Sequence, residues 1–244
     1  MNRFSADSVS LAPRVRVCCS VNLRLIACLL AALPLPAQNL NAVFAKMDST
    51  AKGFSGITAD VRQTAHTAVV NDDSTENGTI RLKHSKNETK ILVDFTSPDA
   101  KTVSITGSEA NVYLPKAKTV QVYDIRSKKS LVDQFMLLGF GANSTELKAT
   151  YDATYVSQEA IAGQPAGHIR LIPKSAEALK SLKSAELWIS DAQGVPVQQK
   201  FTTTANGDYT LMQYSNIKVN PVISDKDLKL TLPKGVHVQP QIGK

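Results

Sequence analysis

Hydrophobic positions follow two different periods along the chain. Between residues 39 and 52, apolar residues recur at the i, i+3, i+4, i+7 spacing of an amphipathic helix. This spacing predicts a helix over residues 39–52, and Gly53 suits the position just beyond its end. The residues that define the apolar face of this helix are Leu40, Val43, Phe44 and Met47.

After residue 56 the hydrophobic period becomes two residues, which is typical of strands with one buried face. Short turn sequences such as "GSE" and "PKAK" separate the alternating segments, so consecutive hairpins and an antiparallel meander are expected. The predicted strands of the first half lie within residues 57–62, 80–83, 91–95, 103–105, 110–114 and 120–122.

The second half repeats this pattern after residue 165. Residues 166–174 are predicted as a strand, 175–184 as a polar connection or helical turn, and 185–220 as three further strands. Asn206-Gly207 is a favourable two-residue hairpin turn, because both residues tolerate positive φ. No shift in composition marks a linker, so the chain is interpreted as one mainly β domain with a few short α-helices.

The first 37 residues have the pattern of a secretory signal peptide. A positive leader precedes the apolar run 25–33, and "PLPAQ" offers a cleavage site after Ala37. The expected domains are therefore a removed signal peptide, 1–37, and a mature domain, 38–244, that is exported to the periplasm. Its removal lowers the formal net charge from +7 to +4, because four arginines and one acid leave.

A lipid anchor is the alternative for this leader, because residues 25–28 resemble a lipobox ending in Cys28. Arg24 stands directly before this motif and the apolar run continues after it, which favours the signal peptide. All three cysteines, at 18, 19 and 28, lie in the leader, so the mature chain has no thiol chemistry.

Motifs that carry catalysis or metal binding are not found in the sequence. The four histidines, at 66, 84, 168 and 237, have no metal-ligand spacing, and no GxSxG, HExxH or phosphate-binding glycine loop is present. The lysines are scattered among acids and form no stripe suited to nucleic acid. We therefore predict no enzyme, no cofactor, no metal and no nucleic-acid partner.

One segment, "SLVDQFMLLGFGAN" at 130–143, has no clear polar face when its residues are arranged as a helix. Pattern alone favours a helix that plugs the core. The alternative is a partial cover over a one-faced sheet, with one side on the sheet and the other bordering a cavity. Methionine and leucine would suit such a lining, because both adapt to ligands of varied shape.

Across its mature part the sequence resembles the LolA-type outer-membrane lipoprotein carriers. The resemblance is carried in order by "SGITADVRQTA" at 55–65, "GTIRLKH" at 78–84, "SPDAKTVSITGSEANVYLPKAKTVQVYD" at 97–124, "DQFMLLGFG" at 133–141 and "LTLPKGVHV" at 230–238. It implies a single curved antiparallel sheet that forms an incomplete β-barrel with a helical lid and encloses an apolar cavity.

The activity that the resemblance implies is carriage of lipoprotein acyl chains across the periplasm. The implied partners are acylated lipoproteins, an inner-membrane ABC-type release complex and an outer-membrane acceptor, and a monomer is expected. The expected lid residues are Phe135, Met136, Leu137, Leu138 and Phe140. The expected cavity residues are Ile80, Leu82, Ile91, Val93, Phe95, Val103, Ile105, Val112, Leu114, Val120 and Val122.

His84 marks a departure from the family. The strand that here reads "RLKHS", 81–85, typically ends in Lys-Arg-Pro, and the resemblance gives that arginine the role of holding the lid closed. His84 stands at the matching lid-control position, where a neutral imidazole makes fewer hydrogen bonds than a guanidinium.

Two other function classes stay open: a periplasmic sensor of lipids or lipoproteins with the same fold, and an envelope enzyme that uses His84 with a nearby acid. Replacing His84 by alanine separates the enzyme from the carrier. A carrier should retain acyl binding, with altered release, whereas a catalyst should lose turnover; binding and product assays on the same variant measure both.

Overall fold

The computed structural model describes residues 36–85, 88–126, 138–203 and 206–241, and all of these belong to one compact unit. The strands of the first half are β1 (Gly56–Thr67), β2 (Asp72–His84), β3 (Thr89–Ser97), β4 (Lys101–Thr106), β5 (Glu109–Leu114) and β6 (Thr119–Asp124). Those of the second half are β7 (Tyr151–Ile161), β8 (Gln164–Pro173), β9 (Ser184–Ser190), β10 (Pro196–Thr202), β11 (Tyr209–Val219) and β12 (His237–Gln241).

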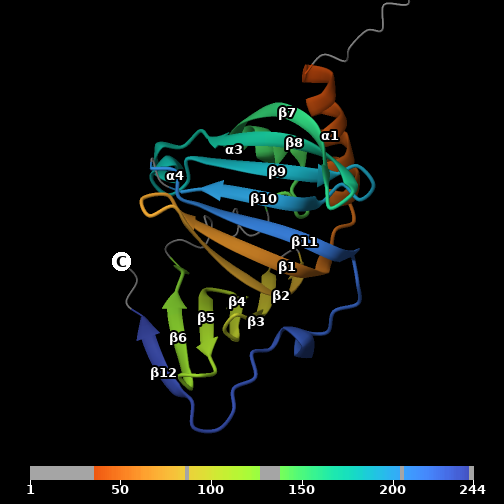
Figure 1. Ribbon diagram of the computed structural model, residues 1–244. Coiled ribbons are helices and arrows are strands. Elements are labelled where there is room, and N and C mark those ends of the chain that lie inside the picture. The colour runs from red at the N-terminus through yellow and green to blue at the C-terminus, as the bar shows by residue number, and fades with distance from the viewer. Residues whose placement is uncertain (1–35, 86–87, 127–137, 204–205, 242–244) are drawn as a thin grey trace, which may run out of the picture. The chain divides into compact units, whose positions relative to one another are not determined.

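These strands form one open, curved sheet in the order β12-β6-β5-β4-β3-β2-β1-β11-β10-β9-β8-β7 (Figure 1). The chain begins in the middle of the sheet, builds to one edge, crosses to the other and returns, so that β11 pairs with β1. All pairs are antiparallel except β12 with β6, which is parallel. The prediction of a mainly β fold with one incompletely closed sheet is confirmed.

Three α-helices lie within the described residues: α1 (Pro36–Ala51), α3 (Ser144–Thr150) and α4 (Ala176–Ser181). The predicted apolar face of α1 is confirmed, because Val43, Phe44 and Met47 are buried in the core cluster over β7, β8 and β9. Gly167 on β8 permits this close packing, since a Cβ there would lie 2.4 Å from Val43 Cγ2. Among the described residues, no helix has the length and apolar character needed to cross a membrane.

The outer face of the sheet is covered locally by the segment between β11 and β12. This segment contains the 3-10 helix η2 (Asp225–Leu228), and its Ile223 and Leu228 pack on Leu92 of β3. Lys83 on β2 bonds Asp225 at 2.8 Å beside this contact. The segment therefore carries the chain across β2 and β3 to the far edge, where β12 joins β6 (Figure 1).

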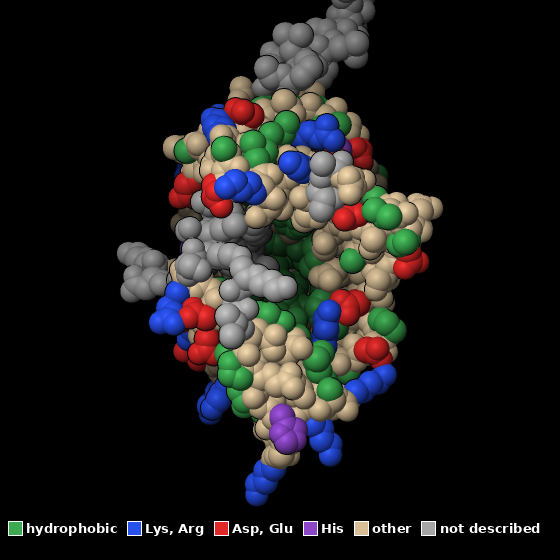
Figure 2. Space-filling view, turned by 90° about the vertical axis from the view of Figure 1, so that its left-hand side faces the viewer, with side chains coloured by type: hydrophobic (Ala, Val, Ile, Leu, Met, Phe, Trp, Pro, Cys, Tyr) green, Lys and Arg blue, Asp and Glu red, His purple; other side chains and the backbone are tan. Residues whose placement is uncertain are grey.

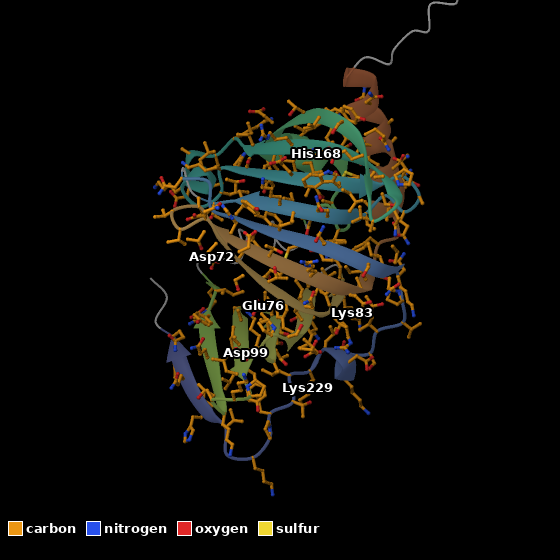
Figure 3. The ribbon with its side chains drawn as sticks, viewed as in Figure 1. Asp72, Glu76, Lys83, Asp99, His168 and Lys229 are labelled. Carbon is orange, nitrogen blue, oxygen red and sulfur yellow. The ribbon has the colours of Figure 1, made fainter. Side chains whose placement is uncertain are left out.

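A polar cluster around the buried His168 joins β7, β8 and β9 on the same outer face. The ring of His168 (Figure 3) stacks on Trp188, with centroids 4.0 Å apart. Its Nδ1 lies 2.8 Å from Glu159 Oε1 and its Nε2 lies 3.0 Å from Glu186 Oε2. The Trp188 indole donates to Glu159 Oε2 at 2.7 Å. The cluster thus links edge strand β7 to its neighbours through side chains as well as backbone.

Glu159 gives this cluster a dependence on pH. Hydrogen bonds from Ser157 and then Trp188 hold the pKa of Glu159 below its ordinary value of 4.5. A depressed carboxyl pKa stabilises the fold above the unfolded pKa, and this stabilisation is lost as the pH falls through the folded pKa.

We predict that Glu159→Gln lowers the free energy of unfolding at pH 7 by ~1 kcal/mol, a value kept small because solvent screens a group 38% exposed. The difference from the wild type should shrink below pH 4.5, where the wild-type carboxylate takes up its proton. Urea unfolding from pH 3 to 8 measures it. Glu177→Gln in an exposed pair with Lys180 is the control, and an equal effect in both variants would contradict the prediction.

Candidate functional site

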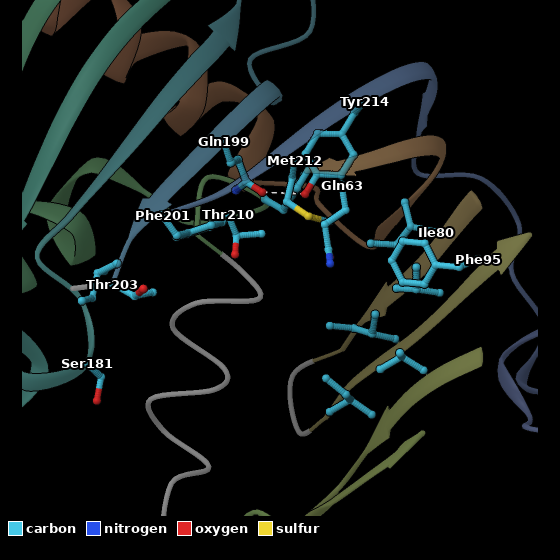
Figure 4. A pocket seen from close by; sticks show the side chains of 16 residues that line it. Gln63, Ile80, Phe95, Ser181, Gln199, Phe201, Thr203, Thr210, Met212 and Tyr214 are labelled. Carbon is cyan, nitrogen blue, oxygen red and sulfur yellow. Dashed lines mark hydrogen bonds between the residues drawn. The ribbon is translucent and has the colours of Figure 1, made fainter. Parts of the chain in front are cut away.

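A cavity of about 320 Å³ lies on the inner face of the sheet, beside the part covered by α1. Strands β2, β3 and β4 supply one wall, and β1, β10 and β11 supply the other (Figure 4). Figure 2 shows hydrophobic side chains within a hollow that opens to the surface. This volume is at the lower end of the range for small-molecule sites, roughly 300–1,000 Å³.

Strand register explains why these side chains meet. Directly paired residues of neighbouring strands point to the same face, so Ile80, Val93 and Val103 form one row across β2, β3 and β4. Ile91 and Ile105 form the next row. On the other wall, Gln63, Met212 and Gln199 form a row across β1, β11 and β10. The two walls are therefore continuous parts of one face.

The structure brings six of the eleven expected cavity residues together in this lining: Ile80, Ile91, Val93, Phe95, Val103 and Ile105. Leu82 lies on the same face but is buried in the core next to Phe54 and Phe140. Val112 and Leu114 also share this face, farther toward the β6 edge, and do not line the cavity.

Val120 and Val122 require a correction, because they lie on the opposite face. Val120 pairs with Tyr113 and Val122 pairs with Asn111, whereas Val112 pairs with Gln121. The tight turn between β5 and β6 pairs Leu114 with Thr119, and this register sends the valines outward. Alternation within β6 was visible in the sequence, but its phase relative to β5 was not.

The second wall was not expected from the sequence. Its residues come from β1, β10, β11 and the end of α4, and many are polar or isolated between polar neighbours. They are Gln63, Ser181, Leu182, Gln199, Phe201, Thr203, Thr210, Met212 and Tyr214. The period-2 pattern of β11, in which Thr210, Met212 and Tyr214 alternate with Leu211 and Gln213, was the only signal that could have found part of this wall.

Two of the five expected lid residues lie within the described chain, and the structure places them in a turn and not in a helix. Leu138 packs with α1 and β9, and Phe140 lines the cavity and meets Tyr214 edge-to-face at 5.2 Å. Phe135, Met136 and Leu137 lie outside the described residues. Leu138 is thus core, while Phe140 is both core and cavity wall.

Gly139 and Gly141 fix the path of this turn on the sheet. Their φ angles of 85° and 76° lie in the left-handed region that favours glycine. A Cβ on Gly139 would lie 2.6 Å from Pro196 Cγ, and one on Gly141 would lie 2.4 Å from the Phe54 ring. Both glycines are therefore required by close packing as well as by backbone conformation.

A buried hydrogen-bond relay ties the same turn to the cavity wall. Tyr214 donates its hydroxyl to Gln199 Oε1 at 2.6 Å (Figure 4), and Gln199 Nε2 donates to the Leu138 carbonyl. Burial raises the pKa of the Tyr214 hydroxyl above its ordinary value of 10.0, which keeps it neutral and able to donate. Gln199 therefore uses both its carbonyl and its amino group in the relay.

His84 lies at the end of β2, on the same face as Ile80 and Leu82. Its Nδ1 is 3.0 Å from Thr89 Oγ1, and its ring lies 6.3 Å from that of Phe54, the residue beneath Gly141. Among the residues that the structure describes, no carboxylate bonds to His84. Its link to the 138–141 turn is therefore indirect and apolar, and the acid required by the enzyme hypothesis is not found beside it.

The chemistry that this lining offers is burial and neutral hydrogen bonding. Its described members carry apolar groups, amides and hydroxyls, with no acidic or histidine side chain. Within the same described residues, no group of three histidine or acidic side chains is arranged to hold a metal. The cavity is consequently suited to apolar ligands.

We predict that Gln199→Leu destabilises the fold by ~1–3 kcal/mol, because the Leu138 carbonyl and the Tyr214 hydroxyl lose their partner in a buried site. Gln198→Leu, the adjacent position on the opposite face, is the matched control and should change stability by less than about 0.5 kcal/mol. Thermal unfolding compares the two. Equal melting temperatures would show that the relay does not stabilise the turn.

Solved structures to which this chain is similar include the complex of Pseudomonas aeruginosa MucA/MucB, at 12% identity over 80% of this chain and 61% of that one, with a TM-score of 0.45. Another is the Mycobacterium tuberculosis lipoprotein LppX, at 16% identity, 75% and 98% coverage, and a TM-score of 0.44. A third is a putative outer membrane lipoprotein-sorting protein domain from Vibrio parahaemolyticus, at 15% identity, 76% and 94% coverage, and a TM-score of 0.41. This chain thus spans about three fifths of the MucB chains that it matches.

No curated protein matches the sequence. A family model does match it, over residues 52–231, which include every strand of the sheet except β12. That model describes the outer membrane lipoprotein carrier protein LolA. The match covers well over half of the chain and both walls of the cavity. The chain therefore belongs to the LolA family of outer membrane lipoprotein carrier proteins.

Proposed function

We propose that this protein is a periplasmic carrier that binds the acyl chains of lipoproteins in the inner-face cavity and moves them from the inner to the outer membrane. The observation that carries the proposal is the apolar wall of β2, β3 and β4, exposed within a cavity on a sheet of this family. Export by a signal peptide at 1–37 would deliver the protein to the periplasm. The donor and acceptor would be an inner-membrane ABC-type complex and an outer-membrane receptor.

Hydrocarbon burial provides the binding free energy in this proposal. Each methylene moved from water into the cavity contributes about 0.8 kcal/mol. The side chains available for contact are apolar and include aromatic, branched and flexible ones, such as Phe95, Ile105 and Met212. A ligand held in this way needs no catalytic group, which agrees with the neutral lining.

The test is a release assay with the purified mature protein and inner-membrane vesicles that carry a lipoprotein. We expect the acylated lipoprotein to appear in the soluble fraction bound to the protein, and the same cargo with its acylated cysteine replaced to give no complex. Binding of acyl chains without removal from the vesicle would favour the sensor instead. No binding of either cargo would contradict the carrier.

Met212→Glu should lower release at least tenfold, because an unpaired carboxylate in the cavity opposes burial of hydrocarbon. Val69→Glu, at a position 78% exposed outside the cavity, is the matched control and should release cargo as the wild type does. Circular dichroism verifies that both variants fold. Equal release by a folded Met212→Glu variant would place the acyl site elsewhere.

A further inference from the structure

The two walls of the cavity differ in chemistry. The wall from β2, β3 and β4 presents only hydrocarbon, whereas β1 and β11 place the amide of Gln63 and the hydroxyl of Thr210 in the same cavity (Figure 4). Met212 and Phe201 lie beside these polar groups. A ligand that fills the cavity would therefore meet hydrocarbon on one side and hydrogen-bonding groups on the other.

Register brings the two polar groups close to each other. Gln63 pairs with Met212, and Ala65 pairs with Thr210, so Gln63 and Thr210 are diagonal neighbours on one face. Such neighbours are separated by roughly 7 Å, within reach of a single ligand group once the glutamine side chain is extended. One carbonyl placed between them could thus accept hydrogen bonds from both.

Both residues keep unused hydrogen-bonding capacity. The Gln63 amide donates to Glu76 Oε2 at 3.3 Å, and its carbonyl has no partner among the described residues. Within the same part of the chain, the Thr210 hydroxyl makes no hydrogen bond. Gln199, by contrast, already bonds through both its amino group and its carbonyl, to Leu138 and Tyr214, in the buried relay. Gln63 thus keeps one free N–H and Thr210 its hydroxyl, and register makes these two donors diagonal neighbours in the lining.

Charges near Gln63 favour a neutral ligand group. Glu76 also accepts from Lys101 Nζ at 2.7 Å, and that ammonium lies 4.9 Å from the Phe95 ring centroid. Lys101 is thus already paired, and an anionic group beside Gln63 would meet the Glu76 carboxylate. The described lining holds no unpaired cation that could compensate the desolvation of a fatty-acid carboxylate, whereas an amide or ester carbonyl needs only neutral donors.

We infer that Gln63 and Thr210 form a polar subsite for the carbonyl at the head of a neutral acyl amide or acyl ester, with the hydrocarbon chain on Ile91, Val93 and Ile105. This inference rests on the proposed acyl-binding function and adds the chemical class of the ligand. An N-acylated protein terminus and a glyceryl ester both carry this carbonyl. The subsite distinguishes both of them from a free fatty acid.

The experiment measures the affinity of the purified mature protein for three probes by isothermal titration calorimetry, below their micelle concentrations at pH 8. The probes are an N-palmitoyl Ser-Ser dipeptide amide, palmitoyl lysophosphatidylcholine and palmitate. We expect the wild type to bind one or both neutral probes at least fivefold more tightly than palmitate. The tighter of the two neutral probes identifies an N-acyl or an ester source.

The Gln63→Leu/Thr210→Val variant should lose about tenfold in affinity for the preferred neutral probe, the loss expected for a pair of neutral hydrogen bonds. Its affinity for palmitate should stay within twofold of the wild type. Gln198→Leu/Thr64→Val makes the same substitutions on the opposite face and should leave all three affinities unchanged. The isosteric Thr210→Val variant alone carries the test if the double variant does not fold.

Equal wild-type affinity for palmitate and the neutral probes would overturn the subsite, as would an unchanged preference in the folded variants. Either result would leave the acyl-carrier proposal standing, because palmitoyl chains would still bind. Failure of the wild type to bind all three probes would overturn the carrier proposal together with the subsite. The two claims therefore fail in different ways.

Discussion

A sheet with one apolar face must cover that face, and this constraint organises the whole molecule. Over β7, β8 and β9 the cover is provided by α1, whose Val43, Phe44 and Met47 are almost fully buried. Over β2, β3 and β4 the described chain supplies less: Phe54 and the 138–141 turn, through Phe140, belong to the core cluster of these strands. The difference in cover between the two halves leaves the cavity, and pairing of β1 with β11 holds its two walls in one continuous surface.

The alternation of apolar and polar residues predicted most of the strands and the apolar wall, because Ile80, Ile91, Val93 and Ile105 show a clear period of two. Strand β7 was missed: as an edge strand it buries few residues, and "YDATYVSQEAI" carries little apolar signal. The outward direction of Val120 was also missed, because the period of a strand does not give its phase across a turn. The lid residues Leu138 and Phe140 were identified as apolar, but their turn conformation depends on contacts of Gly139 and Gly141 far away in sequence.

Polar residues of the site were the hardest to predict, since their roles depend on register. Gln199 and Gln198 are adjacent and identical in type, yet one joins a buried relay while the other bonds Gln213 on the outer face. Gln63 likewise lies beside Glu76 and Met212 only through strand pairing, which could not be predicted from the sequence. The apolar wall of the cavity is thus encoded in a local sequence pattern, whereas its polar wall arises only from strand pairing.

Photo-crosslinking can locate the bound acyl chains, which we propose lie in the inner-face cavity. The mature protein would be loaded with an N-palmitoyl peptide that carries a diazirine at the end of the acyl chain, irradiated, and mapped by mass spectrometry. We expect adducts on cavity residues such as Ile91, Val93 and Met212. Adducts confined to the outer face, around Leu92, Val197 or Leu211, would contradict it.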